Sequence, residues 1–276
     1  MPKPPVAEGS VRSERDLYDG DRQFATTLAR GLDVLRSFSP DAPRLSNKEI
    51  SLRSGLPKPT VSRLTYTLTR LGYLEFSTST RRYQLGSAVL SLGYPLLANL
   101  EVRQVARVHM REMAERFQGW VSIGVRDRLN MVYVETARAS SVITKPDVGQ
   151  CFPIIASSMG RAYLAGLGQA PRDALINQVR IRTPELWREF GPSVEKSLKE
   201  YEDHGFCTRQ DDFAPNWQTA AVSMHGLPGG AAAAFNCAIP LHKLRSQQLR
   251  KEVGPSLVEM VKHLENLMSR RGMPQG

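Results

Sequence analysis

The stretch LSNKEISLRSGLPKPTVSRLTYTLTRLGYL, residues 45–74, predicts two short helices with a tight turn between them. Ser46 and Glu49 have the spacing of a capping box, which starts a helix by satisfying its first backbone amides. Gly55 stands where the left-handed residue that ends a helix is needed. The turn Gly55-Leu56-Pro57 therefore separates a helix over residues 47–54 from one over residues 58–71.

The same region is strongly basic. Between Arg44 and Gly86 it holds eight basic and two acidic residues, a net charge of +6. On the second of the two helices Val61 and three leucines make a buried stripe, and the basic side chains fall on the opposite face. Two short strands, residues 73–76 and 82–85, follow as a wing. A basic helix-turn-helix with a wing suits the major groove of duplex DNA.

Within this module we expect Arg63 to read a base, because a bidentate arginine–guanine pair discriminates by about 1–3 kcal/mol. Other side chains are placed to contact phosphates, which set register and affinity rather than sequence. The alternative is an ordinary helical hairpin with a solvated basic face, and for Arg70 a solvated charge is equally expected. The full set of expected DNA contacts is Lys48, Lys58, Pro59, Thr60, Ser62, Arg63, Tyr66, Arg70, Arg81 and Arg82.

The composition of the 276-residue chain fits two globular domains, with 41% apolar and 23% charged residues. Its net charge of +10 favours polyanionic partners without choosing between nucleic acid and an anionic membrane. Three scattered cysteines indicate reduced thiols, and the N-terminus carries no apolar signal segment, so we expect a cytoplasmic protein. Catalytic motifs, metal-ligand spacings among the five histidines and cofactor-binding loops are absent from the sequence, so we expect no catalytic residue, metal or cofactor.

Domain boundaries follow from these patterns. We expect a disordered tail over residues 1–22, a winged helix-turn-helix domain over 23–86, a linker helix over 87–100 and an effector-binding domain over 101–276. In the first domain, Leu28, Leu32, Leu35 and Phe38 predict an amphipathic first helix. The linker is uncharged but too short and too polar to span a membrane, so we expect it to be buried at a subunit or domain junction.

The second half of the chain predicts a mixed α+β domain in which helices cover an antiparallel sheet. Cys151 and Cys237 are expected to be buried and inert rather than nucleophilic. Asp211 and Asp212 are an acidic pair on a loop, either solvated or part of a binding site. The expected strands are 120–126, 130–136, 140–144, 206–209, 218–225 and 231–239, the last two joined by an LPGG turn. The expected helices are 101–117, one from about Ser157, two opened by Pro171 and Pro184, 194–204 and 254–270.

Four motifs together resemble the IclR (isocitrate lyase regulator) family of bacterial transcription factors. They are RGLDVLRSF (30–38), LPKPTVSRLTYTLTRLGYL (56–74), RRYQLG (81–86) and GQCFPIIASSMGRAYLAGL (149–167). The resemblance covers nearly everything but the tails. It implies a winged helix-turn-helix, a linker helix and a C-terminal domain similar to the GAF fold that binds a small organic acid or aromatic metabolite.

The resemblance also implies partners and a pocket. The partners are a double-stranded DNA operator, a small-molecule effector and further copies of the chain in a homodimer or homotetramer, with no membrane association. Ile155 and Arg161 depart from the family, which often has His and Lys there, and Ile155 predicts a more apolar pocket mouth. The implied effector-binding residues are Ser157, Ser158, Met159, Asp211, Asp212, Thr219, Ala221, Asn236 and Cys237.

Two other functions remain open from the sequence. One is an enzyme with an accessory DNA-binding domain, which would use Cys237 or the Asp211-Asp212 pair. The other is a DNA-binding protein that responds to no effector. A thiol enzyme would lose turnover in Cys237→Ser, whereas an effector-independent protein would show no ligand-induced thermal shift.

Overall fold

Local signals start and end the helices of the N-terminal part as the sequence predicts. The Ser46 hydroxyl accepts from the Glu49 amide, while the Glu49 carboxylate accepts from the Ser46 amide at 2.8 Å, which completes the capping box. Gly55 then ends the helix with φ +66°, a conformation that glycine adopts without strain. Pro57 precedes the next helix, whose first turn also contains a proline.

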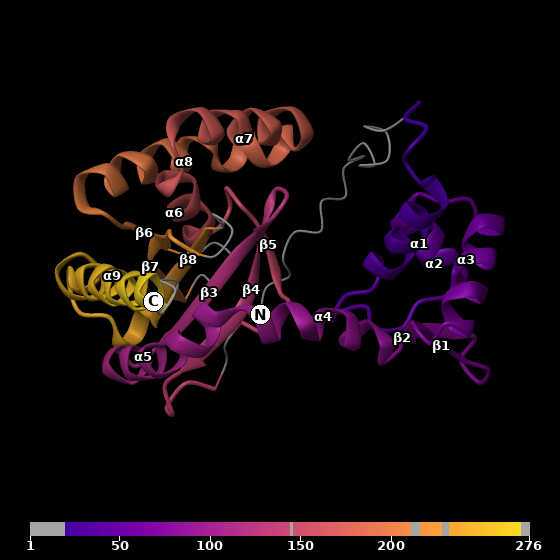
Figure 1. Cartoon of the computed structure of the whole chain (residues 1–276), viewed down its shortest axis with the longest axis horizontal. Helices are drawn as coiled ribbons and strands as arrows, with labels where there is room; N and C mark the ends of the chain where they lie inside the picture. The colour runs from indigo at the N-terminus through magenta and orange to yellow at the C-terminus, as the bar shows by residue number, and fades with distance from the viewer. Residues whose placement is uncertain (1–19, 144–145, 211–215, 228–231, 272–276) are drawn as a thin grey trace, which may run out of the picture. The chain divides into compact units, whose positions relative to one another are not determined.

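The structure, a computed structural model, describes residues 20–143, 146–210, 216–227 and 232–271. The chain divides into two compact units, the first ending at Asn99 and the second beginning at Leu100 (Figure 1). Apart from residues 20–22, the tail expected over residues 1–22 lies outside the described residues, as does most of the LPGG turn.

The N-terminal unit is a winged helix-turn-helix followed by a further helix. Strands β1 and β2 of the wing pair antiparallel, with Leu74 opposite Leu85. Its elements are α1 (Thr26–Arg36), α2 (Asn47–Ser54), α3 (Lys58–Arg70), β1 (Leu74–Ser77), β2 (Arg82–Leu85) and α4 (Ala88–Asn99).

The core of this unit corrects the stripe predicted for the first helix. Leu28 and Leu32 are 65% and 45% exposed, whereas Val34, which lies off that stripe, is fully buried. Only the C-terminal half of α1 carries residues that enter the core, and Leu71, just beyond α3, is also exposed. The buried core residues are Val34, Phe38, Leu45, Ile50, Leu56, Val61 and Leu74.

No residue of helix α4 is buried within the single chain, and its expected burial at a subunit or domain junction stays a prediction. Four large apolar side chains, Leu90, Leu92, Tyr94 and Leu96, are between 61% and 73% exposed. Among the described residues, no helix combines the length and the apolar character needed to cross a membrane.

The C-terminal unit is built on a six-stranded antiparallel sheet in the order β5-β4-β3-β8-β7-β6. Its strands are β3 (Trp120–Asp127), β4 (Asn130–Arg138), β5 (Cys151–Pro153), β6 (Cys207–Gln210), β7 (Trp217–Met224) and β8 (Ala233–Pro240). Its helices are α5 (Glu101–Phe117), α6 (Ser158–Gly166), α7 (Gln169–Arg182), α8 (Pro184–His204), the 3₁₀ turn η3 (Leu241–Lys243), the π-helical turn η4 (Leu249–Val253) and α9 (Gly254–Arg271).

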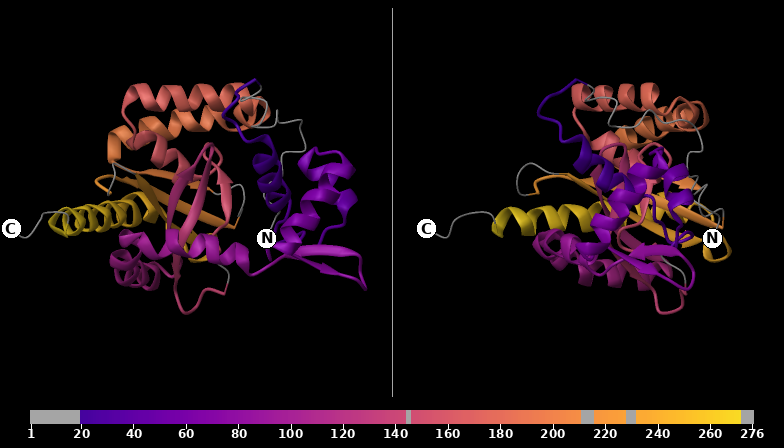
Figure 2. Two further views of the ribbon diagram at one scale, coloured as in Figure 1. Left: turned by 45° about the vertical axis from the view of Figure 1, so that its right-hand side comes forward. Right: turned by 90° about the vertical axis from the view of Figure 1, so that its right-hand side faces the viewer.

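Helices cover the sheet on both faces, as Figures 1 and 2 show. α5 packs on β3 and β4 and α9 on β7 and β8, while α6 packs on β6, β7 and β8 and carries α8 behind it. Glu135 lies on the sheet face that α5 and α9 cover, because its carboxylate pairs with Arg103 and Arg107 of α5. Ser223 lies on the opposite face, which α6 and α8 cover, because its hydroxyl is hydrogen-bonded to the Tyr201 hydroxyl of α8 at 2.8 Å. The predicted fold class, α+β with a winged helix-turn-helix and an antiparallel sheet domain, is confirmed.

Three expectations for this unit were wrong. The strand expected over residues 140–144 is absent from the described part of that range, because Ser140 and Ser141 form a turn whose Ser140 amide donates to the Glu115 carboxylate at 2.7 Å. The edge strand is instead β5. The helices expected from Pro184 and from Val194 are one helix, α8, which carries Pro192 within it on an exposed position. Cys151 is exposed rather than buried.

Candidate functional site

The expected DNA-reading face lies on the exposed side of α3. Pro59, Ser62, Arg63 and Tyr66 are exposed, as is Lys58 at the helix start. Thr60 is half-buried, and Lys48 is exposed on α2. A face of this kind can enter a major groove with the N-terminal turn of the helix leading.

Arg70 is not simply solvated. Its Nε donates to the Tyr66 hydroxyl at 3.3 Å, and its guanidinium carbon lies 5.3 Å from the centre of the Tyr66 ring. Such an arginine–aromatic contact stabilises by about 0.5–1 kcal/mol at an exposed site. The pair therefore holds the Arg70 charge along α3, one turn beyond Tyr66.

The two wing arginines are placed differently. Arg81 is exposed at the tip of the wing with φ +54°, a left-handed conformation that is uncommon for a residue other than glycine. Arg82 turns inward, pairing with Glu49 at 3.0 Å and donating to the Arg44 carbonyl at 2.9 Å. Arg82 thus anchors the wing to α2, a role that the sequence did not suggest.

Glu49 joins the helix cap to the wing. Hydrogen bonds from the Ser46 hydroxyl and amide, together with the nearby Arg82 guanidinium, hold the pKa of Glu49 below its ordinary value. The wing carries a second chain of contacts, in which Arg44 donates to Gln84 at 3.2 Å and Gln84 donates to Glu75 at 2.8 Å. The wing is therefore positioned by polar side chains on both of its strands.

The expected effector residues lie on β7, β8 and the start of α6. Alternate residues of β7, including Thr219 and Ala221, share the face marked by Ser223. Asn236 lies directly opposite Ala221 and Ser122, so it shares that face too. Cys237 lies opposite Val121 and Ala220, on the face covered by α5 and α9, so the structure separates it from the others. Asp211 and Asp212 lie outside the described residues.

The start of α6 holds its serines by ordinary helix chemistry. Ser157 is the N-cap, and its hydroxyl accepts from the Gly160 amide at 3.0 Å. Ser158 is 2% exposed, and its carbonyl accepts from the Cys207 thiol at 3.6 Å. Met159 is fully buried against Gly124, where a Cβ would collide with the Met159 sulfur. Of these three, Met159 is a core residue.

Two buried polar atoms on the same face have no hydrogen-bond partner among the described residues. They are the Asn236 Oδ1 oxygen and the Trp120 Nε1 nitrogen. Because Trp120 lies opposite Ala238, and Ser122 opposite Asn236, the two side chains are diagonal neighbours on β3 and β8. Between them, Ser122 is satisfied by Thr136 at 3.0 Å. Buried polar atoms are rarely left unpaired, so one acceptor and one donor here await a partner.

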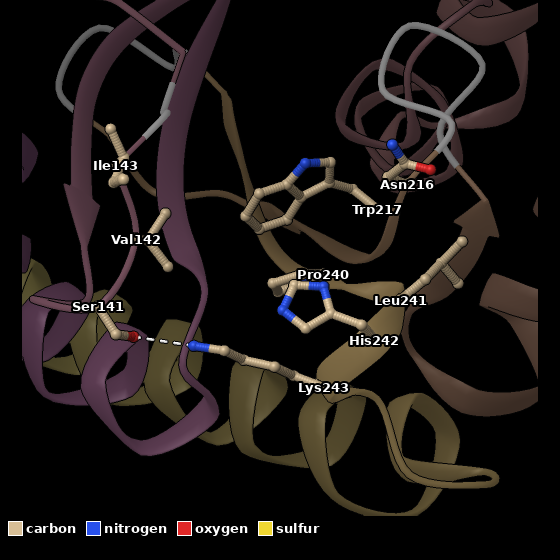
Figure 3. A pocket seen from close by; sticks show the side chains of 9 residues that line it. All are labelled: Ser141, Val142, Ile143, Asn216, Trp217, Pro240, Leu241, His242 and Lys243. Atoms are coloured by element: carbon tan, nitrogen blue, oxygen red, sulfur yellow. Dashed lines mark hydrogen bonds between the residues drawn. The ribbon is translucent and has the colours of Figure 1, made fainter.

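A cavity of about 430 Å³ is lined by Trp217, whose ring contacts that of Trp120, although neither Trp120 nor Asn236 is among its described lining residues. The Trp217 ring lies 3.8 Å from the Trp120 ring, centre to centre, and also lines the cavity (Figure 3). Val142, Ile143 and Leu241 make the wall apolar, while His242 and Lys243 bring nitrogen groups to it. Lys243 also donates to Ser141 at 3.0 Å. Sequence reasoning missed both tryptophans, although their places at strand starts were visible.

Neither buried thiol suits catalysis. Burial raises the pKa of Cys237 to about 12 and that of Cys207 to about 12, so both are protonated at neutral pH. The Cys237 thiolate on which the thiol-enzyme alternative depends is therefore disfavoured.

A winged helix-turn-helix joined to a sheet domain with a cavity defines a ligand-sensing type of DNA-binding protein. Residues 27–77 match the IclR helix-turn-helix domain, and residues 95–266 match the C-terminal domain of the bacterial transcriptional regulator IclR. The chain belongs to the IclR family of DNA-binding transcriptional regulators.

Similar proteins include regulators and solved structures. The chain is 30% identical to the HTH-type transcriptional regulator TsaQ1/TsaQ2 of Comamonas testosteroni, over 96% of each chain. A crystal structure of an IclR family transcriptional regulator from Brucella abortus is 38% identical, with a TM-score of 0.82 over 90% of this chain and 94% of that one. An IclR homologue from Microbacterium hydrocarbonoxydans, solved with 4-hydroxybenzoate, shares the fold at 21% identity and a TM-score of 0.67, over 88% of this chain and 99% of that one.

Proposed function

We propose that this regulator responds to a small aromatic carboxylate bound on the α6-facing side of the sheet. The observation that carries the proposal is that two buried atoms, Asn236 Oδ1 and Trp120 Nε1, have no hydrogen-bond partner among the described residues, while the Trp120 ring contacts Trp217, which lines the cavity. A ligand hydroxyl can donate to the first atom and accept from the second. A ligand that forms hydrogen bonds with such buried atoms gains binding free energy, because it relieves the cost of leaving them unpaired.

The cavity walls favour an aromatic acid. Trp217 offers a ring face for stacking, and Lys243 offers a cation for a carboxylate. A volume of about 430 Å³ falls within the range of small-molecule sites. The structural neighbour solved with 4-hydroxybenzoate has the same fold, and that compound combines a ring, a hydroxyl and a carboxylate.

Tryptophan fluorescence tests this proposal directly. In a Trp187→Phe background the remaining tryptophans are Trp120 and Trp217, so the emission reports on the site alone. Titration with 4-hydroxybenzoate should give a saturable change, and benzoate, which lacks the hydroxyl, should bind more weakly. Equal affinity for the two compounds would contradict the roles of Asn236 and Trp120. The absence of any saturable change with either acid would remove the aromatic-acid assignment.

For DNA we propose that Arg63 reads a base, with Ser62, Pro59 and Tyr66 at its sides. Lys48, Lys58, Thr60, Arg70 and Arg81 contact the backbone or sugars, and Arg82 positions the wing. Mobility-shift titration against salt tests the phosphate contacts, since the logarithm of affinity falls by about 0.9 per contact for each tenfold rise in salt. A flat salt dependence would exclude this arrangement.

We further propose that the regulator acts as a homodimer or a dimer of dimers. Support comes from the exposed apolar residues of α1 and α4, notably Leu28, Leu32, Leu90 and Leu96, which a monomer would leave in water. Two copies present two recognition helices to two half-sites. Effector binding would then shift the population between arrangements of the two reading units and so change operator affinity.

A further inference from the structure

A second cavity, of about 360 Å³, lies at the β6 edge of the C-terminal sheet. α8 leads directly into β6 there, and α6 packs against both (Figure 1). Among the residues that the structure describes, none lines both cavities. Gln218 and Thr208 on its wall belong to the sheet face opposite to Thr219, so the cavity wraps around the edge strand.

The wall of this cavity is basic. Arg161, Lys196, Arg209 and Arg250 line it, and Glu200 is the one carboxylate among the described lining residues, which leaves a net charge of +3. The carboxylate is already engaged, because it accepts from the Thr208 amide at 2.8 Å and from the Thr208 hydroxyl at 2.7 Å. Arg250 also donates to it at 3.2 Å. The hydroxyls of Ser193 and Ser197 add neutral donors.

Two of the cations are built into the fold rather than free to swing away. Arg161 is 3% exposed, and its Nε donates to the Ile155 carbonyl at 2.8 Å. Arg209 donates to the Ala156 carbonyl, and its guanidinium carbon lies 5.4 Å from the centre of the Phe190 ring. Both arginines therefore hold the backbone immediately before Ser157, the N-cap of α6. Two charged side chains of this cavity are therefore bonded to the backbone at the start of α6.

Arg250 supplies an independent observation. It lies in η4, a π-helical turn that precedes α9. π-helical turns are less stable than α-helix and occur often at functional sites. Here the wider turn belongs to an element that lines the cavity, and it places Arg250 within reach of Glu200 on α8.

We propose that this cavity is a second ligand site, which takes a small polyanion such as a phosphate ester or a polycarboxylate. Guanidinium groups match the planar fork of carboxylate and phosphate oxygens, and the exposed Lys196 ammonium adds a further cation to the wall. Because Arg161 and Arg209 hold Ile155 and Ala156, such an anion acts as a co-effector that stiffens the start of α6. The site is distinct from the proposed aromatic-acid site.

Thermal unfolding of the full-length protein tests the proposal, with inorganic phosphate and citrate as probes at ionic strength matched with KCl. A saturable rise in Tm is expected with at least one of them. The double variant Lys196→Ala/Arg250→Ala should weaken that anion's apparent affinity at least roughly tenfold, since it removes two charge-assisted contacts. Both side chains are exposed, so the fold should survive their removal.

The matched control is Lys199→Ala/Lys251→Ala. It removes the same charge from the same two elements, at exposed positions outside the cavity wall. It should keep the affinity of the wild type. An equal loss in both double variants, or no saturable shift with either probe, would show an adventitious ion only and overturn the proposal.

A further variant separates the two sites. Asn236→Leu should weaken the affinity for 4-hydroxybenzoate about tenfold and leave the affinity for the anion unchanged. If the variant weakens both affinities while far-ultraviolet circular dichroism shows an intact fold, the two ligands share one site and a separate anion site does not exist. Failure of the aromatic-acid proposal alone leaves the anion response in place, so the two outcomes are distinguishable.

Discussion

At the scale of single residues, Asn236 is unusual because it places a polar side chain in the buried core. It is 2% exposed, and its Oδ1 has no partner among the described residues, although Ser122 directly across the strand pair is hydrogen-bonded to Thr136. An unmet buried acceptor costs about 1–3 kcal/mol of folding free energy. A binding protein can carry such a cost when a ligand relieves it, because stability and function trade against each other at binding sites.

The first prediction concerns Asn236→Leu. Replacing the unpaired amide by an apolar side chain of similar volume should leave the free energy of unfolding unchanged or raise it by about 1 kcal/mol, while the affinity for 4-hydroxybenzoate falls about tenfold. Chemical denaturation and fluorescence titration measure the two quantities. Ser122→Ala is the contrast, since it strands Thr136 and should cost about 1 kcal/mol. A large destabilisation by Asn236→Leu would mean that the amide is satisfied in the free protein.

The second prediction distinguishes base recognition by Arg63 from phosphate contact by Lys58 on α3. Arg63→Ala should lower affinity for an operator fragment by about 1–3 kcal/mol and relax discrimination at one base pair. Lys58→Ala should weaken binding about equally on all sequences and reduce the salt slope by about 1. Mobility shifts on the operator and on a single-base variant of it measure both effects. Unchanged discrimination in Arg63→Ala would place base reading elsewhere.

At the scale of elements, the bounds of a helix were predicted best where capping residues set them. Ser46, Glu49 and Gly55 set the bounds of α2 because caps act within one turn of the chain. A strand was wrongly predicted over residues 140–144 because the β-branched side chains of Val142 and Ile143 favour strands. The chain turns there instead, where the Ser140 amide donates to the carboxylate of Glu115, which is distant in sequence. The edge strand β5 is three residues long and ends in a proline, which gives no periodic signal.

The candidate site was predictable only in part, for a related reason. The family resemblance implied both Asn236 and Cys237 as effector residues, but their separation onto opposite faces depends on the strand register, because successive residues of a strand alternate faces. Trp120 and Trp217 meet across β8, which lies between β3 and β7 in the sheet. Contacts between residues so far apart along the chain leave no mark on local periodicity.

The third prediction concerns the cap and wing junction at Glu49. Its pKa is held below the ordinary value, so its charge contributes stability that is present above the unfolded pKa and lost as the pH falls through the folded one. Glu49→Gln keeps a side-chain acceptor for the capping box but removes the charge beside Arg82, so it should destabilise the N-terminal unit by only about 0.5 kcal/mol at pH 7, because the pair is partly exposed to solvent. The difference should shrink as the pH is lowered below 4.5.

Urea unfolding at several pH values, followed by circular dichroism, measures this difference. Glu185→Gln is the control, because Glu185 is exposed in the first turn of α8 and makes only a surface pair with Arg188 at 3.5 Å. A pH-independent effect of Glu49→Gln would show that the loss comes from packing rather than from charge.

At the scale of the whole molecule, the chain combines a basic helix-turn-helix unit with a sheet unit whose described residues line at least two cavities. The division falls at Asn99 and Leu100, directly after a helix none of whose residues is buried. The exposed apolar side chains of α4 support the proposal that copies of this chain assemble through this helix. In the proposed mechanism, an effector acts by changing how those copies are arranged.

The fourth prediction follows. Leu90→Glu/Leu96→Glu, which charges the exposed face of α4, should lower the mass measured by sedimentation equilibrium and weaken binding to a two-half-site operator far more than to a single half-site. The control is Ile181→Glu, which charges an equally exposed apolar residue, 71% accessible, on α7. An unchanged mass in the α4 variant would place the interface on another surface.

The three cysteines, all of which fall within the described residues, differ in exposure in a way that allows labelling of the C-terminal unit at a single site. Cys207 and Cys237 are buried and remain protonated at neutral pH, whereas Cys151 is exposed on β5, a few residues ahead of the α6 cap. A maleimide dye should therefore attach to the native chain at one position without any engineering. Its emission would follow the backbone that leads to Ser157, in real time, as either class of ligand is added.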